Sequence, residues 1–183
     1  MSTTLLLPGL YNSAPGHWQS IWEQTLPATI RVQQQNWELP QKDDWVASLA
    51  AAVAAVDGPV VLAAHSLGCA LVAWWVRQGM PGAGQAGRIK GALLVAPPGV
   101  ERAAFPAPSF APMPTMRLPF TCKVIASSND PWCDMAVTEA WARQWGAQLH
   151  NIGAKGHING ESGLGAWQQG QDWLKQVGAD MQK

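Results

Sequence analysis

The chain has 183 residues, of which 48% are apolar and 13% are charged, a balance typical of one compact globular domain rather than a disordered chain. Twelve basic and twelve acidic side chains cancel, and without a dense basic run the sequence argues against nucleic-acid binding. The first residues lack the basic and apolar regions of a signal peptide, and no segment approaches the run of about 18 apolar residues that a membrane span needs. We therefore expect a single cytoplasmic domain over residues 1–183, with no membrane or nucleic-acid partner.

Strand-like runs alternate with helix-like runs along the whole chain. The expected strands are Thr3–Leu7, Thr29–Gln34, Pro59–His65, Ile89–Val95, Cys122–Ser127 and Gln148–Ile152. Between them, apolar residues recur at helical spacing, as at Trp45, Leu49 and Val53. Strands separated by helices pair in parallel through right-handed crossovers, with helices on both faces of the sheet. The sequence thus predicts an α/β fold, a three-layer α/β/α sandwich with about six mostly parallel strands.

Residues 97–120 interrupt this alternation with seven prolines between Pro97 and Pro119. The segment leaves the carboxyl end of the fourth expected strand, the edge where parallel sheets bind their ligands. A long loop in a compact domain is often functional. The segment is therefore either a surface loop stiffened by proline or a lid-like wall of a pocket, and the sequence does not choose between them.

The third expected strand runs directly into a serine and then into a helical pattern. Ser66 follows the buried run that ends at His65, and the helix-like spacing begins at Leu67. This is the layout of a nucleophile elbow, a sharp strand-to-helix turn that exposes a serine oxygen above a parallel sheet. The tight turn requires small residues two positions before and two positions after the serine, and these are Ala64 and Gly68. The pattern predicts that Ser66 is a nucleophile.

A serine nucleophile needs a base and a carboxylate that orients the base, and on this fold they follow the serine in the order acid, then histidine. Asp130 comes just after the fifth expected strand, and His157 lies in a glycine-flanked loop after the sixth. The carboxyl ends of parallel strands meet at one edge of the sheet, so these groups can converge with Ser66. We predict that Ser66, Asp130 and His157 form a catalytic triad.

Three other histidines are weaker candidates for the base. His65 adjoins the serine, but successive strand residues point to opposite sides. His150 lies inside the last expected strand, where a satisfied core or edge histidine is the expected role. His17 begins a helix, and its expected role is packing or capping.

Two other acidic residues compete with Asp130 for the role of the carboxylate. Asp134 is expected in the first turn of the following helix, where a negative charge is favourable to the helix dipole. Glu161 is close to His157 in the sequence, but its loop position indicates a surface or supporting group. Asp130 is therefore preferred.

An acyl-transfer site also needs hydrogen-bond donors for the developing oxyanion. One donor is expected to be the backbone N–H of Leu67, the residue after the nucleophile. The second is expected from the loop after the first strand, where the N–H of Leu10 is preferred and that of Gly9 comes next. A Pro-Gly sequence at this point is equally typical of a simple turn.

With these residues identified, the chain resembles the retinoblastoma-binding-protein-9-like small serine hydrolases of the α/β-hydrolase superfamily. The resemblance implies a compact core that lacks the first two antiparallel strands of larger relatives, the same triad, and a lid position for the loop after the fourth strand. The segments that carry it are Leu7-Pro8-Gly9, His17-Trp18-Gln19, Ala64-His65-Ser66-Leu67-Gly68-Cys69, Ser128-Asn129-Asp130-Pro131, Gly156-His157-Ile158-Asn159 and Ser162-Gly163-Leu164-Gly165.

The sequence predicts a carboxylesterase-like serine hydrolase that cleaves small carboxylic esters, with amides second, through an acyl-enzyme intermediate and without a cofactor or metal. The alternative is a partner-binding protein on an α/β-hydrolase scaffold with little turnover, because a fold does not guarantee an activity. A protein partner is conceivable but has no support in the sequence. Thiol chemistry at Cys69 or Cys133 is disfavoured because no base is placed for either.

Overall fold

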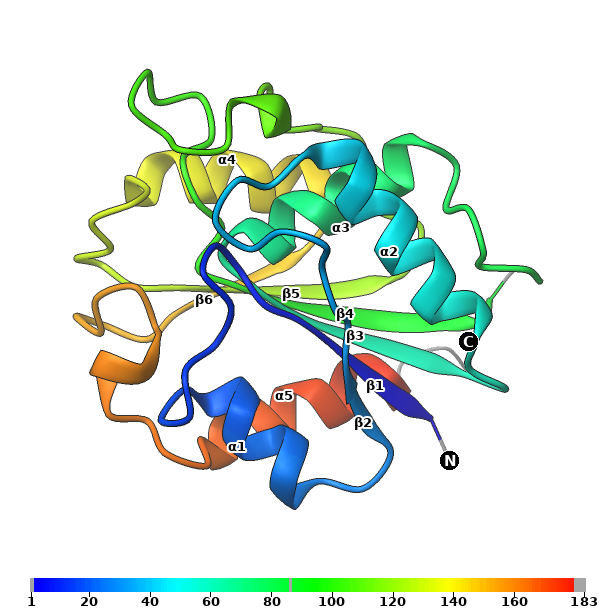
Figure 1. The fold of residues 1–183 in the computed structure, drawn as a ribbon. Coiled ribbons are helices and arrows are strands. Elements are labelled where there is room, and N and C mark those ends of the chain that lie inside the picture. Colours follow the sequence, from blue (N-terminus) through cyan, green and yellow to red (C-terminus); the bar gives the residue numbers. More distant parts are fainter. Residues whose placement is uncertain (1, 86, 180–183) are drawn as a thin grey trace.

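A computed structural model describes residues 2–85 and 87–179 and shows a twisted sheet of six parallel strands in the order β2-β1-β3-β4-β5-β6 (Figure 1). Every pairing between neighbouring strands is parallel. The strands are β1 (Thr3–Leu7), β2 (Thr29–Arg31), β3 (Val60–His65), β4 (Ile89–Val95), β5 (Thr121–Ala126) and β6 (Gln148–Asn151). The predicted α/β class and parallel sheet are confirmed.

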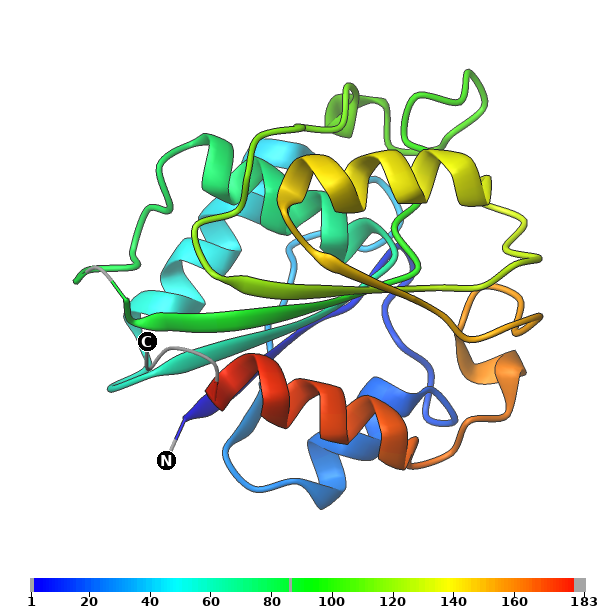
Figure 2. The ribbon, with the colours of Figure 1, turned by 180° about the vertical axis from the view of Figure 1, so that it is seen from behind.

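Helices cover both faces of this sheet, as Figures 1 and 2 show from opposite sides. The helices α2 (Lys42–Ala54), α3 (Leu67–Arg77) and α4 (Met135–Trp145) lie on one face, and α1 (Trp18–Thr25) and α5 (Gln168–Ala179) lie on the other. Two short 3₁₀ helices, η1 (Pro108–Phe110) and η2 (Gly160–Ser162), lie in loops. Within residues 2–85 and 87–179, no helix has the length and apolar character needed to cross a membrane.

The core consists of two apolar layers, one on each face of the sheet. Trp45 and Trp75 fill the layer beneath α2 and α3, and Trp22 of α1 lies in the opposite layer, all with no exposed surface. All six residues of β3 are buried, as expected for a strand covered on both faces. This double cover explains why the central strands read as unbroken apolar runs.

The second strand is shorter than predicted. It was expected to reach Gln34, but β2 ends at Arg31, and only the N–H of Val32 makes one further bond, to the carbonyl of Leu6 (2.9 Å). The strand β2 is at the edge of the sheet and pairs only with β1, which ends at Leu7. Beyond that residue the chain turns away, so residues 33–34 have no strand to pair with.

His150 was predicted to be a core or edge histidine with its hydrogen bonds satisfied. Its position on an edge strand is confirmed, but the prediction of satisfied hydrogen bonds is wrong. It lies on the edge strand β6, and its ring packs on Trp173 of α5 with 4.9 Å between the centroids. Its Nε2, however, is buried without a hydrogen-bond partner. Packing, not hydrogen bonding, holds this ring.

The proline-rich segment between β4 and β5 is attached to the helices on one face of the sheet. The indole N–H of Trp74 donates to the carbonyl of Phe110 (2.7 Å), and that of Trp145 donates to the carbonyl of Pro114 (2.8 Å). Phe110 itself is fully buried. These bonds fix the second half of the segment to α3 and α4.

Candidate active site

Ser66 lies at a sharp turn between β3 and α3. Its backbone φ is 53° and its ψ is −124°, a strained conformation for a residue with a side chain, of the kind that clusters at functional sites. A Cβ added to Gly68 would lie 2.2 Å from the carbonyl oxygen of Leu7, and one added to Gly9 would lie 2.7 Å from the Cβ of Ser66. The chain segments around the serine are therefore so close that only glycine fits at these two positions, as the sequence predicted for Gly68.

The structure brings Ser66, His157 and Asp130 together. The Oγ of Ser66 lies 2.8 Å from the Nε2 of His157, and the Nδ1 of that ring lies 2.9 Å from each carboxylate oxygen of Asp130. A carboxylate accepts only, so Nδ1 carries the proton and Nε2 is free to accept the serine O–H. This is the geometry in which a histidine can take the proton of a serine hydroxyl.

The loops that carry Asp130 and His157 are tied to each other. The hydroxyl of Ser127 accepts a hydrogen bond from the N–H of Lys155 (2.9 Å) and donates to the Oδ1 of Asn129 (2.9 Å). The same Oδ1 accepts from the N–H of Gly156 (2.8 Å). These bonds set the loop after β6 against the loop after β5, one residue before His157.

His65 has a role that the sequence did not reveal. Its Nε2 lies 2.9 Å from the carbonyl oxygen of His157, and because a carbonyl only accepts, Nε2 is the protonated nitrogen. Burial lowers the pKa of His65 well below its usual value, with smaller contributions from His17 and His157. His65 is thus a neutral donor that holds the backbone of His157. No spacing in the sequence points to this contact, because it joins residues 92 positions apart.

The remaining candidates take the structural roles expected of them. His17 is the N-cap of α1, where its Nδ1 accepts the N–H of Gln19 (3.1 Å). Asp134 is the N-cap residue of α4 and makes no side-chain capping bond. Glu161 is exposed in η2. Neither acid lines the cavity around Ser66.

The residues expected to supply the oxyanion donors lie on the two chain segments that flank Ser66. Leu67 is the first residue of α3, and Leu10 lines the cavity that contains Ser66. In the part of the chain that the structure describes, the N–H groups of Gly9, Leu10 and Leu67 meet no backbone acceptor. All three groups therefore remain available to a bound oxygen.

A small cavity of about 190 Å³ opens beside Ser66 and His157. Phe105 and Pro106 of the proline-rich segment line it, so this part of the segment forms a wall of the pocket. Trp132, which is 43% exposed, stands edge-on to Phe105 with 6.3 Å between the ring centroids. The cavity therefore has an aromatic wall beside the serine.

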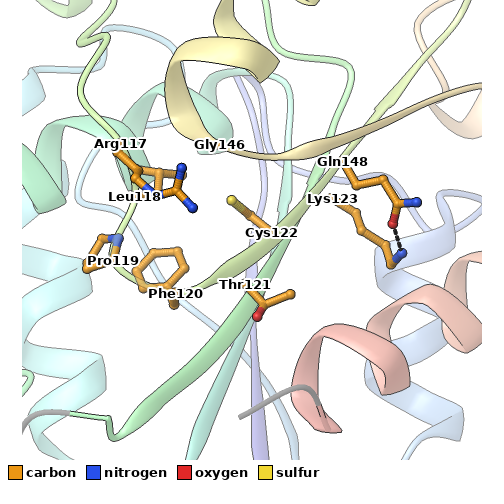
Figure 3. Close-up of a pocket in the computed structure, with 9 residues that line it drawn as sticks. All are labelled: Arg117, Leu118, Pro119, Phe120, Thr121, Cys122, Lys123, Gly146 and Gln148. Atoms are coloured by element: carbon orange, nitrogen blue, oxygen red, sulfur yellow. Dashed lines mark hydrogen bonds between the residues drawn. The ribbon is translucent and has the colours of Figure 1, made fainter. Parts of the chain in front are cut away.

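A larger and shallower hollow of about 600 Å³ lies at the opposite edge of the sheet, around the amino ends of β5 and β6 (Figure 3). Its two basic side chains, Arg117 and Lys123, lie at opposite ends, and Lys123 is bonded to Gln148. Among the described residues that line it, none is a serine, a histidine or an acid. Its thiol, Cys122, has a pKa that burial raises to about 12, and none of these described residues is a base placed beside it to activate it.

Comparison with known proteins agrees with this geometry. The model of the serine hydrolase family matches residues 4–176. Among solved structures, a protein described as a YdeN-like hydrolase of Pectobacterium atrosepticum is 32% identical, with a TM-score of 0.84 over 97% of this chain and 91% of that one. The ydeN gene product of B. subtilis is 18% identical, with a TM-score of 0.78 over 97% and 98% of the two chains, and shows the same fold. No match was found among curated proteins. The chain belongs to the serine hydrolase family.

Proposed function

We propose that the protein hydrolyses small carboxylic esters through an acyl-enzyme intermediate, with amides as slower substrates. The observation that carries this proposal is the contact of 2.8 Å between the Oγ of Ser66 and the Nε2 of His157 at the wall of a cavity. The resemblance to retinoblastoma-binding-protein-9-like hydrolases and a cytoplasmic location belong to the same proposal.

In the first half of the reaction, the Oγ of Ser66 attacks the ester carbonyl while its proton moves to the Nε2 of His157. The N–H groups of Leu67 and Leu10 hold the oxyanion of the tetrahedral intermediate, with that of Gly9 as the alternative to Leu10. The intermediate collapses, the C–O bond to the alcohol breaks, and His157 returns the proton to the departing oxygen. Asp130 stays ionised and stabilises the imidazolium.

In the second half, a water molecule attacks the acyl-Ser66 ester and gives its proton to His157. The second tetrahedral intermediate releases the carboxylic acid, and the proton returns to the serine oxygen. Every proton moves between the serine, the histidine and the two leaving or entering oxygens. The residues at the site therefore suffice for the whole cycle.

The size of the cavity supports a small substrate. A volume of about 190 Å³ is below the range of roughly 300–1,000 Å³ that holds drug-sized ligands. Apolar contact with Phe105 and Trp132 favours an acyl or alkoxy group without charge. An ester is also a better substrate than an amide, because an alcohol is a better leaving group than an amine.

A fluorophosphonate probe tests the proposal, because it reacts with an activated serine. We expect the wild-type protein to be labelled and Ser66→Ala to remain unlabelled. Ser48→Ala, the same substitution on α2, is the matched control and should label as the wild type does. Labelling of Ser66→Ala, or no labelling of a folded wild-type protein, contradicts the proposal. The alternative, a partner-binding protein on an α/β-hydrolase scaffold, would then be favoured. A series of p-nitrophenyl esters should then show the highest kcat/KM for short acyl chains.

A further inference from the structure

The two sides of the cavity beside Ser66 differ in chemistry. One wall is aromatic and comes from Phe105 and Trp132. The other comes from the loops after β1 and β6, which contribute the polar side chains of Asn12, His17 and Asn159 together with Leu10 and Tyr11. These two loops lie side by side in both views (Figures 1 and 2), and a Cβ added to Gly160 would lie 3.5 Å from the backbone nitrogen of His17. This second wall is therefore one continuous surface.

His17 lines the cavity, and its ring packs edge-to-face with that of His65, with 4.6 Å between the centroids. Its Nδ1 accepts the N–H of Gln19, so that nitrogen is unprotonated and Nε2 carries the hydrogen. Burial, together with the charge of Arg31, lowers the pKa of His17 to about 3, which keeps the ring neutral. The residue is only 4% exposed, and its Nε2 is buried without a partner. A buried N–H without an acceptor is costly unless something binds to it.

The two asparagines on the same wall are used in the same way. The Oδ1 of Asn12 accepts hydrogen bonds from Arg31 Nη1 and from the N–H of Ser13, each at 2.8 Å. The Oδ1 of Asn159 accepts the N–H of Glu161 at 3.0 Å. Because both amide oxygens face donors, each amide leaves its nitrogen free. In His17, Asn12 and Asn159, the side-chain acceptor atom is therefore already hydrogen-bonded within the protein.

Side chains that can only donate hydrogen bonds favour a ligand that carries a hydrogen-bond acceptor. The charge of the residues that line the cavity decides whether that acceptor is an anion or a neutral oxygen. Among the described residues that line the cavity, none is a lysine or arginine. The nearby guanidinium of Arg31 is already paired with Glu23 at 2.7 Å. A carboxylate would lose its hydration here without gaining a partner of opposite charge, which is unfavourable. A neutral carbonyl or ether oxygen carries no such penalty.

We infer that the preferred substrates are short oxo- or alkoxy-esters, whose second, neutral oxygen accepts a hydrogen bond from the Nε2–H of His17. This inference rests on the proposed hydrolase activity and adds a substrate class to it. Phe105 and Trp132 then contact the alkyl part of the same molecule. His17 acts as a specificity-determining residue.

Two pairs of esters with equal numbers of heavy atoms test this inference. Methyl 3-oxobutanoate and methyl 3-methylbutanoate differ in the acyl part, and 2-oxopropyl butanoate and isobutyl butanoate differ in the alkoxy part. We expect the ratio of kcat/KM, oxo ester over alkyl ester, to fall at least about tenfold in His17→Phe for one of the pairs. Intrinsic reactivity cancels because each ratio is compared between two proteins.

Asn159→Asp is the second variant. It keeps the oxygen that accepts from Glu161 but replaces the amide N–H₂ with an oxygen that repels an acceptor, so it should lower the same ratio. His150→Phe is the matched control, because it removes another buried and unpartnered Nε2 from a site outside the cavity. Its ratio should equal that of the wild type.

The inference is wrong if both ratios are unchanged in His17→Phe. Unchanged ratios with full activity would assign the N–H to a water molecule, and unchanged ratios with an equal loss for the two esters of each pair would assign His17 a structural role. Binding to Ser66→Ala, followed by NMR titration with the same esters, separates this result from failure of the proposed function. Tighter binding of the oxo ester to Ser66→Ala that disappears in Ser66→Ala/His17→Phe supports His17 as the donor to the second oxygen, and if the wild type then neither labels nor hydrolyses, only the proposed function has failed. Normal labelling with no such preference overturns the inference and leaves the proposed function standing.

Discussion

The two edges of the sheet carry very different hollows. The hollow at the amino ends of β5 and β6 has about three times the volume of the cavity beside Ser66, 600 Å³ against 190 Å³. Yet in the larger one the two basic groups stand apart (Figure 3), whereas at the smaller one His157 lies within hydrogen-bond distance of both Ser66 and Asp130. Volume alone would have pointed to the wrong edge.

The difference comes from the direction of the chain. In a parallel sheet the carboxyl ends of all strands meet at one edge, and the loops that leave them can bring distant residues together. At the other edge the chain enters β6 directly from α4 and enters β5 from the end of the proline-rich segment. Among the described residues, neither connection brings a serine, a histidine or an acidic side chain into the hollow.

The largest expected effect is on the triad. Asp130→Asn should lower kcat by about 10⁴-fold, because the amide no longer fixes the tautomer of His157. Arg117→Ala, in the large hollow, should leave kcat and KM unchanged. Steady-state kinetics on p-nitrophenyl butyrate compares the two variants. Equal losses in both would show that the two edges do not divide the chemistry in this way.

The next largest expected effect is on stability, and it tests whether the backbone is more closely packed at the edge that carries Ser66. Gly68→Ala forces a Cβ to within 2.2 Å of a backbone oxygen, so we expect a loss of about 3 kcal/mol, or a Tm lower by about 6–12 °C. Gly16→Ala, where an added Cβ meets nothing within 4 Å, should change stability by less than about 0.5 kcal/mol. Thermal unfolding followed by circular dichroism measures both. If Gly68→Ala were as stable as the wild type, close backbone approach would not distinguish the edge that carries Ser66.

A smaller effect concerns acid. His17 and His65 are buried and neutral at the catalytic edge, with the pKa of His17 lowered to about 3 and that of His65 lowered as well. Below about pH 6.5 the unfolded chain takes up protons that the folded chain refuses, so stability falls as the pH falls, by up to about 1.4 kcal/mol per pH unit for each histidine. His17→Phe should flatten the slope of unfolding free energy between pH 6.5 and 4.5. Urea titrations at several pH values measure it, and an unchanged slope would contradict the assignment.

The smallest expected effect is none at all. Burial raises the pKa of Cys122, at the large hollow, to about 12, and raises that of Cys69, beside the elbow, well above its usual value. Thiols on both edges should therefore resist iodoacetamide at pH 7.5 in the native protein, with no loss of esterase activity. Mass spectrometry of native and urea-unfolded samples checks this. Rapid alkylation of Cys69 with inactivation would bring thiol chemistry back into consideration.

Much of the fold could be predicted because the central strands are covered on both faces. β1 and β4 have the predicted bounds, and β3 begins one residue late, since uninterrupted apolar runs leave little choice of register. β2 could not be bounded in this way. Its end is set by the absence of a neighbouring strand beyond Leu7, which no local pattern encodes.

In the candidate site, too, some features could be predicted from the sequence and others could not. Ser66, Asp130 and His157 follow strand ends, so topology alone predicts that they share an edge. The contacts of His65 and Asn129 with the loop around His157 depend on how two loops pack, and they join residues 92 and 27 positions apart. The sequence also could not predict that the Nε2 of His17 has no hydrogen-bond partner, because this depends on which ring nitrogen caps α1.

The edge strand β6 is short, with four residues and a single neighbour, and strand pairing alone would let its end fray. The loop beyond it is nevertheless held by Ser127, Asn129, His65 and Trp18, from three different parts of the fold. Releasing His157 would mean breaking bonds to the end of β3, the loop after β5 and α1 together. Loss of activity on heating should therefore coincide with cooperative unfolding of the whole domain, not with an earlier local opening.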